Sequence, residues 1–195
     1  MSIFDKIFGN KPKEQPEESG QDAVSKGKIP ADTHFVQQFK ERGGKFLYCL
    51  TPEEVIGFLK DIFIENAWES AYCLDKSLQS NLGVIGIPND QEAPVFYTTC
   101  EHLIAEDGSI LFSSNQLKET KLMLYPNNFI VFATTSQLIH DKDKALTSIK
   151  YRFKKEIPSN ISAIKDYMPH KKDPNFLNYG NTNSKNLYLL LLEDL

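Results

Sequence analysis

The sequence Phe-Ile-Val-Phe-Ala-Thr, residues 129–134, is the stretch that decides the fold of this chain. Successive side chains of a strand point to opposite faces, so an unbroken apolar run makes a strand apolar on both faces. Such strands are typical of the interior of a parallel sheet that helices cover on both sides. The run Leu-Tyr-Leu-Leu-Leu-Leu at residues 187–192 has the same character and predicts a second buried strand.

Candidate helices and further strands alternate along the rest of the chain. Thr51-Pro52-Glu53-Glu54 predicts a helix start, because it joins a capping hydroxyl, a proline suited to the first turn and two acids near the positive end of the helix dipole. Asp32 caps an earlier predicted helix, which Gly43-Gly44 ends. Further strands are predicted at residues 45–50, 70–74, 95–99 and 110–113, and further helices at 77–82 and 141–153. The alternation predicts an α/β domain with a mainly parallel sheet flanked by helices.

The first 30 residues have a different composition from the rest of the chain. Four large apolar residues near its start, Ile3, Phe4, Ile7 and Phe8, share one face of a two-turn helix. Residues 10–29 are mostly charged, Pro, Ser and Gly residues, which predicts a disordered linker. We interpret residues 1–8 either as a helix that docks on a partner or a membrane surface, or as a frayed terminus. Residues 31–195 are predicted to form a single α/β domain.

Charge and cysteine content exclude several classes of protein. The 195 residues include 22 basic and 26 acidic side chains, and the net charge of -4 argues against a nucleic-acid-binding protein. No apolar run approaches the ~18 residues of a transmembrane segment, and the N-terminus has no apolar core typical of a secretion signal. The three widely spaced cysteines suit neither a disulfide framework nor a set of metal ligands. We therefore expect a cytoplasmic protein without a bound metal or cofactor.

The segment Cys-Glu-His-Leu-Ile-Ala-Glu-Asp-Gly-Ser-Ile-Leu-Phe-Ser-Ser, residues 100–114, holds the densest set of candidate site residues. Asp107-Gly108 favours a tight turn, and an acid there would stand at the rim of the sheet, where open α/β sheets bind ligands. Glu106 is accordingly the candidate catalytic residue, as a nucleophile or base, and Gly108 and Ser109 offer backbone N–H groups to an anion. The alternative is a plain hairpin turn with a solvated Glu106.

Other polar residues near this turn each have two interpretations. Glu101 forms a carboxylate pair with Glu106 or an ion pair with a lysine. Cys100 and His102 share a strand face, as a nucleophile and base would, but no third group orients them, which favours a small core residue at Cys100. The run 113–116 either binds a ligand or forms a solvated loop. Lys121 is a candidate for contact with a phosphate.

The segment 100–114 also resembles the core signature of the LUD-domain family, of the lactate utilisation protein C type. The matches begin at Thr98 and Glu101 and continue through Ile104-Ala105-Glu106 to Gly108-Ser109-Ile110-Leu111. Four later segments also resemble the family pattern. They are Pro126 before the strand at 129–132, Asp143-Lys144-Ala145-Leu146, Pro158-Ser159 and the closing strand at 187–194. The resemblance covers residues 31–195.

The sequence also departs from the family pattern at polar positions. Ala163 and Lys165 replace two acidic residues of the late turn, and Phe129 replaces a histidine. The family's Gly-Arg pair is absent, and Lys118 or Lys121 would be only a displaced substitute for its charge. These losses leave open whether the chain is an enzyme.

The resemblance implies a fold similar to the sugar-phosphate isomerases and coenzyme A transferases, which bind anionic ligands at strand ends. It implies an accessory or ligand-binding subunit that acts with iron–sulfur partner proteins in the oxidation of L-lactate or a related organic acid to pyruvate. One alternative is a transferase or isomerase for a coenzyme A thioester or phosphorylated substrate, because Ala105-Glu106-Asp107-Gly108 is similar to the glutamate turn of the transferases. Another is an interaction module whose site has decayed. The predicted ligand-binding residues are Thr98, Glu101, Gly108, Ser109 and Lys121.

Overall fold

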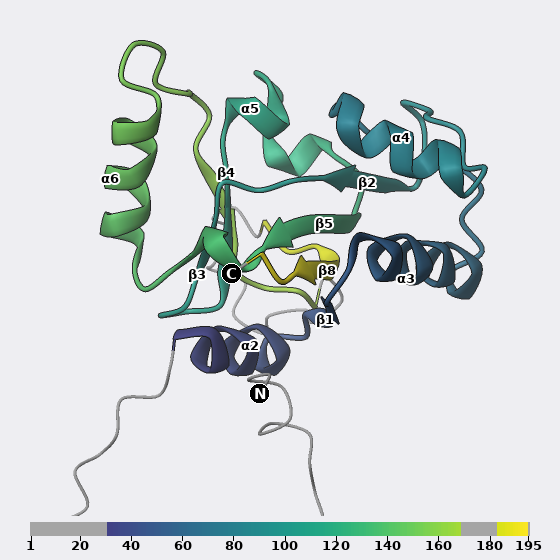
Figure 1. The fold of residues 1–195 in the computed structure, drawn as a ribbon. Helices are drawn as coiled ribbons and strands as arrows, with labels where there is room; N and C mark the ends of the chain where they lie inside the picture. Colours follow the sequence, from purple (N-terminus) through teal and green to yellow (C-terminus); the bar gives the residue numbers. More distant parts are fainter. Residues whose placement is uncertain (1–30, 169–182, 195) are drawn as a thin grey trace, which may run out of the picture.

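The computed structural model describes residues 31–168 and 183–194, and its centre is a four-stranded parallel sheet (Figure 1). The strand order is β1-β8-β5-β2, with β1 at Lys45–Cys49, β8 at Asn186–Leu192, β5 at Asn128–Thr134 and β2 at Val95–Thr98. The two strands with apolar residues on both faces, β5 and β8, occupy the interior of the sheet. The prediction of an α/β fold with a parallel sheet flanked by helices is confirmed.

Alternate residues of the interior strands enter two separate hydrophobic cores. Phe129, Val131 and Leu189 pack on the side of helix α2 (Ala31–Glu41) and a second sheet. Ile130 and Leu190 point to the opposite side, where they pack with α3 (Pro52–Glu65) and α4 (Lys76–Val84). Each core is therefore built from one face of the same sheet.

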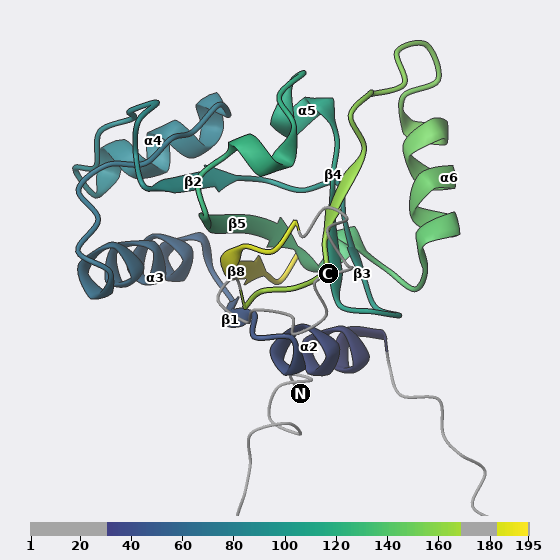
Figure 2. The same ribbon diagram turned by 180° about the vertical axis from the view of Figure 1, so that it is seen from behind.

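The second sheet is mixed and has the order β6-β3-β4-β7. Its strands are β6 at Leu138–Ile139, β3 at His102–Ile104, β4 at Ser109–Phe112 and β7 at Ser162–Ile164. Strands β3 and β4 form an antiparallel hairpin, and helix α6 (Lys142–Arg152) packs on this sheet through Ala145 and Ile149. Both views place the second sheet between the parallel sheet and α6 (Figures 1 and 2).

Local signals placed the start of α3 correctly, whereas Asp32, predicted to cap the first helix, lies inside the first turn of α2, which begins at Ala31. The Thr51 hydroxyl accepts a hydrogen bond from the backbone N–H of Glu54 at 3.3 Å, and α3 begins at Pro52. Asp141 caps α6 in the same way, through a 2.9 Å bond from the N–H of Lys144. These bonds satisfy backbone donors that a helix leaves without an internal partner.

The predicted strand at residues 70–74 is wrong. This segment makes only isolated bridges, at Ala71 and Tyr72, and does not extend into a ladder. The backbone N–H of Cys73 donates instead to the side-chain oxygen of Asn89 at 2.9 Å. Because the Asn89 side chain, and not a strand, accepts this hydrogen bond, the backbone pairing next to β2 ends after Tyr72.

The predicted terminal helix and linker at residues 1–30 lie outside the described residues. Among the helices of residues 31–168 and 183–194, none has the length and apolar character that crossing a membrane requires. The described domain begins with α2 and ends just after β8.

Candidate functional site

Glu101 is a buried carboxylate held by neutral donors on one side and by an arginine on the other. Its residue is 2% exposed and lies between β2 and β3. Oε1 accepts hydrogen bonds from Ser113 Oγ at 2.7 Å, Asn115 Nδ2 at 2.7 Å and Gln116 Nε2 at 3.3 Å. Arg152 Nη1 lies 3.4 Å from Oε2. We call these five residues the Glu101 cluster.

The three neutral donors converge because a short helix begins beside Glu101. Ser113 is the N-cap of α5 (Ser114–Leu117), and Gln116 closes a capping box by accepting from the Ser113 N–H at 3.0 Å. The polar run 113–116 therefore has a third role, beyond the ligand loop and the solvated loop considered from sequence. It solvates a buried charge inside the protein.

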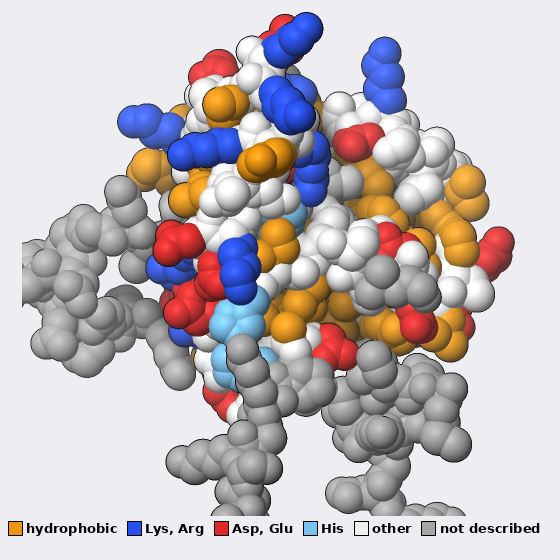
Figure 3. Space-filling view, turned by 60° about the vertical axis from the view of Figure 1, so that its left-hand side comes forward, with side chains coloured by type: hydrophobic (Ala, Val, Ile, Leu, Met, Phe, Trp, Pro, Cys, Tyr) orange, Lys and Arg blue, Asp and Glu red, His pale blue; other side chains and the backbone are white. Residues whose placement is uncertain are grey.

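Arg152 is a candidate site residue that the sequence did not reveal. It is the last residue of α6, and its side chain is 48% exposed although one nitrogen binds Glu101. A guanidinium carries five N–H donors in a planar fork, so most of the fork remains available to a carboxylate or phosphate. Lys and Arg side chains gather on the side of the molecule that carries α6 (Figure 3). The exposed members near Arg152 are Lys150, Lys154 and Lys155.

His102 lies next to Glu101 and is also buried, at 2% exposed. Its Nδ1 lies 3.2 Å from the backbone oxygen of Gln137, which only accepts, so Nδ1 carries the hydrogen. In the neutral ring Nε2 is then an acceptor, and it has no hydrogen-bond partner among the described residues. Burial lowers the pKa of His102, and the nearby charge of Arg152 lowers it further. The ring is therefore neutral at neutral pH.

Acidification is expected to destabilise the fold through His102. Because its folded-state pKa lies below the ordinary value of 6.5, the unfolded chain binds more protons than the folded chain between the two values. The free energy of unfolding should therefore fall as the pH decreases below 6.5. Urea denaturation of the wild type and His102→Gln over this range measures the effect, and the variant should show the shallower decline. Equal slopes would contradict this role of His102.

Cys100 is a core residue in the structure. The thiol is 3% exposed, and burial raises its pKa well above the usual range. Its nearest polar contact is Gln137 Nε2, at 3.8 Å from Sγ. An uncharged thiol is a poor nucleophile, so the geometry favours the packing interpretation of Cys100.

The turn that contains Glu106 is the β3–β4 hairpin, and it lies at the second sheet. Glu106 is exposed. Gly108 adopts a φ of +65°, and a Cβ atom there would lie 2.6 Å from the backbone nitrogen of Phe39 in α2. The turn therefore needs glycine both for its conformation and for its close approach to α2.

Backbone donors of this turn are already in use. The N–H of Gly108 donates to the Ile104 oxygen at 2.9 Å, and the N–H of Ser109 donates to Asp107 Oδ1 at 3.1 Å. Ser109 is fully buried, and its hydroxyl donates to the same Asp107 oxygen at 2.6 Å. An anion at this turn would have to displace these bonds, and a ligand role for Gly108 and Ser109 stays a prediction.

Thr98 and Lys121 belong neither to the Glu101 cluster nor to the turn of the β3–β4 hairpin. Thr98 is buried at the carboxyl end of β2 and donates from Oγ1 to the Thr99 oxygen at 3.2 Å. Lys121 is exposed and precedes a short 3-10 helix at Leu122–Leu124. In the described part of the chain no side-chain hydrogen bond joins two of the six predicted site residues.

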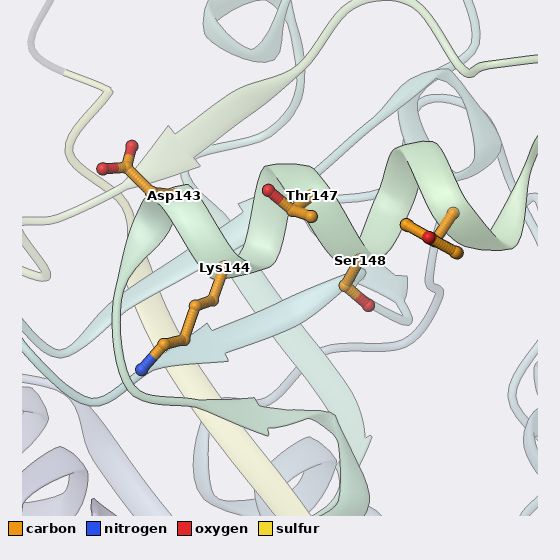
Figure 4. A pocket seen from close by; sticks show the side chains of 5 residues that line it. Asp143, Lys144, Thr147 and Ser148 are labelled. Atoms are coloured by element: carbon orange, nitrogen blue, oxygen red, sulfur yellow. The ribbon is translucent and has the colours of Figure 1, made fainter.

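Two surface hollows lie away from the predicted site residues. One of about 400 Å³ is lined by α6 residues alone, so it is open on the side away from the helix (Figure 4). Its lining residues are Asp143, Lys144, Thr147, Ser148 and Tyr151. A second, of about 270 Å³, lies beside α3 and includes Phe63 and Trp68. Neither contains a predicted site residue.

Within residues 31–168 and 183–194, no group of three His, Cys, Asp or Glu side chains is placed to hold a metal ion. Cys49 and Cys73 are buried in the core beside α3, whereas Cys100 is buried in the other core. The thiols are thus divided between the two faces of the parallel sheet.

Comparison with known proteins gives a family and a fold. No curated protein matches this sequence. A solved structure of a DUF162 family protein from Deinococcus radiodurans is similar, with a TM-score of 0.58 over 84% of this chain and 96% of that one. The sequence identity is 11%, so this likeness concerns the fold alone. The family model of the LUD domain matches residues 88–192, a span that includes Glu101, Glu106 and Arg152. This chain belongs to the LUD domain family.

Proposed function

We propose that this LUD-domain chain is an accessory, ligand-binding subunit in the oxidation of L-lactate or a related organic acid to pyruvate. In this proposal the exposed N–H groups of Arg152 bind the carboxylate of the acid. The observation that carries it is the half-exposed guanidinium anchored on the buried carboxylate of Glu101.

Anchoring matters because a free arginine loses much side-chain freedom when it binds a ligand. Glu101 contacts one nitrogen of the guanidinium, Nη1, and Ser113, Asn115 and Gln116 donate hydrogen bonds to Glu101 in turn. The guanidinium is therefore oriented before the ligand binds. Binding sites commonly use such further hydrogen bonds to fix the residues that contact the ligand. The exposed lysines near Arg152 add a positive field that attracts small anions.

Electron transfer is assigned in this proposal to iron–sulfur partner proteins. Cluster ligation requires several thiolates around one site. Here Cys49 and Cys100 are buried on different faces of the parallel sheet, and burial raises the pKa of the Cys49 thiol to about 12. Such thiols support packing better than ligation. The proposal therefore predicts that the chain co-purifies from cells with a cysteine-rich iron–sulfur subunit.

Isothermal titration of the purified chain with L-lactate tests the binding site. Arg152→Gln should weaken binding about tenfold or more, because it removes charge-assisted hydrogen bonds worth roughly 1.5–3 kcal/mol each. Lys150→Gln removes a charge from the same helix and should change the Kd by less than about twofold. Equal affinity of the wild type and Arg152→Gln would refute the site.

The same titration separates this proposal from a transferase or isomerase that acts through Glu106. The Glu106 side chain is exposed, and in the described structure it makes no hydrogen bond or ion pair with the Glu101 cluster. Glu106→Gln should therefore leave the affinity for L-lactate unchanged. A large loss of affinity in this variant would move the ligand to the hairpin turn.

A further inference from the structure

Two lysines from different elements share one carboxylate beside the β3–β4 hairpin. Lys142 Nζ lies 2.6 Å from Asp107 Oδ2, and Lys165 Nζ lies 3.9 Å from the same oxygen. Arg42 adds a third cation, and its Nη1 donates to the backbone oxygen of Lys165 at 3.2 Å. We call these four residues the Asp107 cluster.

The two amines do not share the carboxylate equally. Partial burial works against the charged form of Lys142, but its hydrogen bond to Asp107 outweighs this and raises its pKa. The neighbouring Lys142 lowers the pKa of Lys165, as do partial burial and the charge of Arg42, while the Asp107 carboxylate acts in the opposite direction. The Lys165 side chain is 54% exposed. Lys165 is thus an accessible amine at the longer distance from Asp107, and the charges of Lys142 and Arg42 favour its neutral form.

We propose that Lys165 is a carbonyl-reactive amine that forms an imine with a 2-oxo acid. The positive charges of Lys142 and Arg42 attract the carboxylate of this acid. A lysine placed next to another cation is a known way to obtain an amine nucleophile near neutral pH. This cluster shares no residue with the Glu101 cluster, so the inference stands or fails separately from the proposed function.

The reaction needs no oxidant or additional reactant. The lone pair of Lys165 Nζ attacks the carbonyl carbon, and the electrons of the C=O double bond move to oxygen. A proton transfers from nitrogen to that oxygen, which gives a carbinolamine. Lys142, the ammonium within reach, donates a proton to the hydroxyl, which leaves as water while the C=N bond forms. The protonated imine then returns its proton to Lys142, so amine and ketone are converted to imine and water.

Reductive trapping tests the site in the full chain. The protein is incubated with pyruvate and cyanoborohydride near neutral pH, and the labelled lysines are identified by peptide mass spectrometry. Lys165 should be labelled faster than Lys150, an exposed lysine of α6, because each unit by which the pKa of Lys165 lies below the ordinary lysine value raises its neutral fraction about tenfold. Labelling of Lys165 at the rate of Lys150 would overturn the proposal.

Two further comparisons exclude simple exposure as the cause. In Lys142→Gln, Lys165 becomes the main partner of Asp107, so its labelling should fall about tenfold for each unit by which its pKa rises, whereas Lys150 labelling stays constant. Acetone, which has no carboxylate, should show a smaller preference for Lys165 over Lys150 than pyruvate shows. An unchanged Lys165 rate in Lys142→Gln, with an unaltered circular dichroism spectrum, or an equal preference for acetone would each contradict the proposal.

Discussion

Replacing Glu101 by alanine is expected to lower the free energy of unfolding by about 1–3 kcal/mol, because it leaves the buried Ser113 hydroxyl without the carboxylate that accepts its hydrogen bond. The variant would leave Ser113, Asn115 and Gln116 without their shared acceptor, and Arg152 without its carboxylate. Urea denaturation followed by circular dichroism measures the loss. Glu101→Gln keeps an acceptor of the same shape and should cost less.

Glu106→Ala is the matched control for this prediction. Glu106 lies five residues further along the chain but is exposed, so its replacement should change the free energy of unfolding by less than about 0.5 kcal/mol. Similar losses for Glu101→Ala and Glu106→Ala would show that the Glu101 cluster does not stabilise the fold.

The second large effect is expected at Phe129, which is fully buried in the parallel sheet. Its ring centroid lies 5.3 Å from that of Phe96, 6.1 Å from that of Phe112 and 6.4 Å from that of Tyr125. Phe129→Ala should cost about 3–5 kcal/mol, through lost burial and the cavity that remains.

Tyr151→Ala provides the comparison for Phe129, because this aromatic side chain on α6 is 72% exposed. Its loss should be within about 0.5 kcal/mol of zero. A small loss for Phe129→Ala would mean that the ring cluster repacks around the missing side chain. The same ring explains a sequence departure, since Phe129 fills a core position where the family resemblance led us to expect a histidine.

Features set by neighbouring residues were predictable from the sequence. The capping hydroxyl and proline at Thr51-Pro52 determine where α3 begins, and the two-sided apolar runs placed β5 and β8 inside the sheet. The turn at Gly108 was also recognisable, because its conformation depends on a single positive φ.

Long-range pairing could not be read in the same way. Strands β3 and β7 contain three residues each, too few for a period to show, and each depends on a partner elsewhere in the chain. Arg152 follows Glu101 by 51 positions, so no local pattern joins them. The signal that was available is the capping box of Ser113 and Gln116, which predicts a helix start at Ser114 but not its contact with Glu101.

The most direct test of a carboxylate site at Arg152 is the Nε–Hε NMR resonance of its side chain during titration with L-lactate. We predict a saturable shift of this resonance that is absent when sodium chloride is added to the same ionic strength. Lactate binding that leaves the Arg152 resonance unmoved, or a shift that chloride reproduces, would contradict the account.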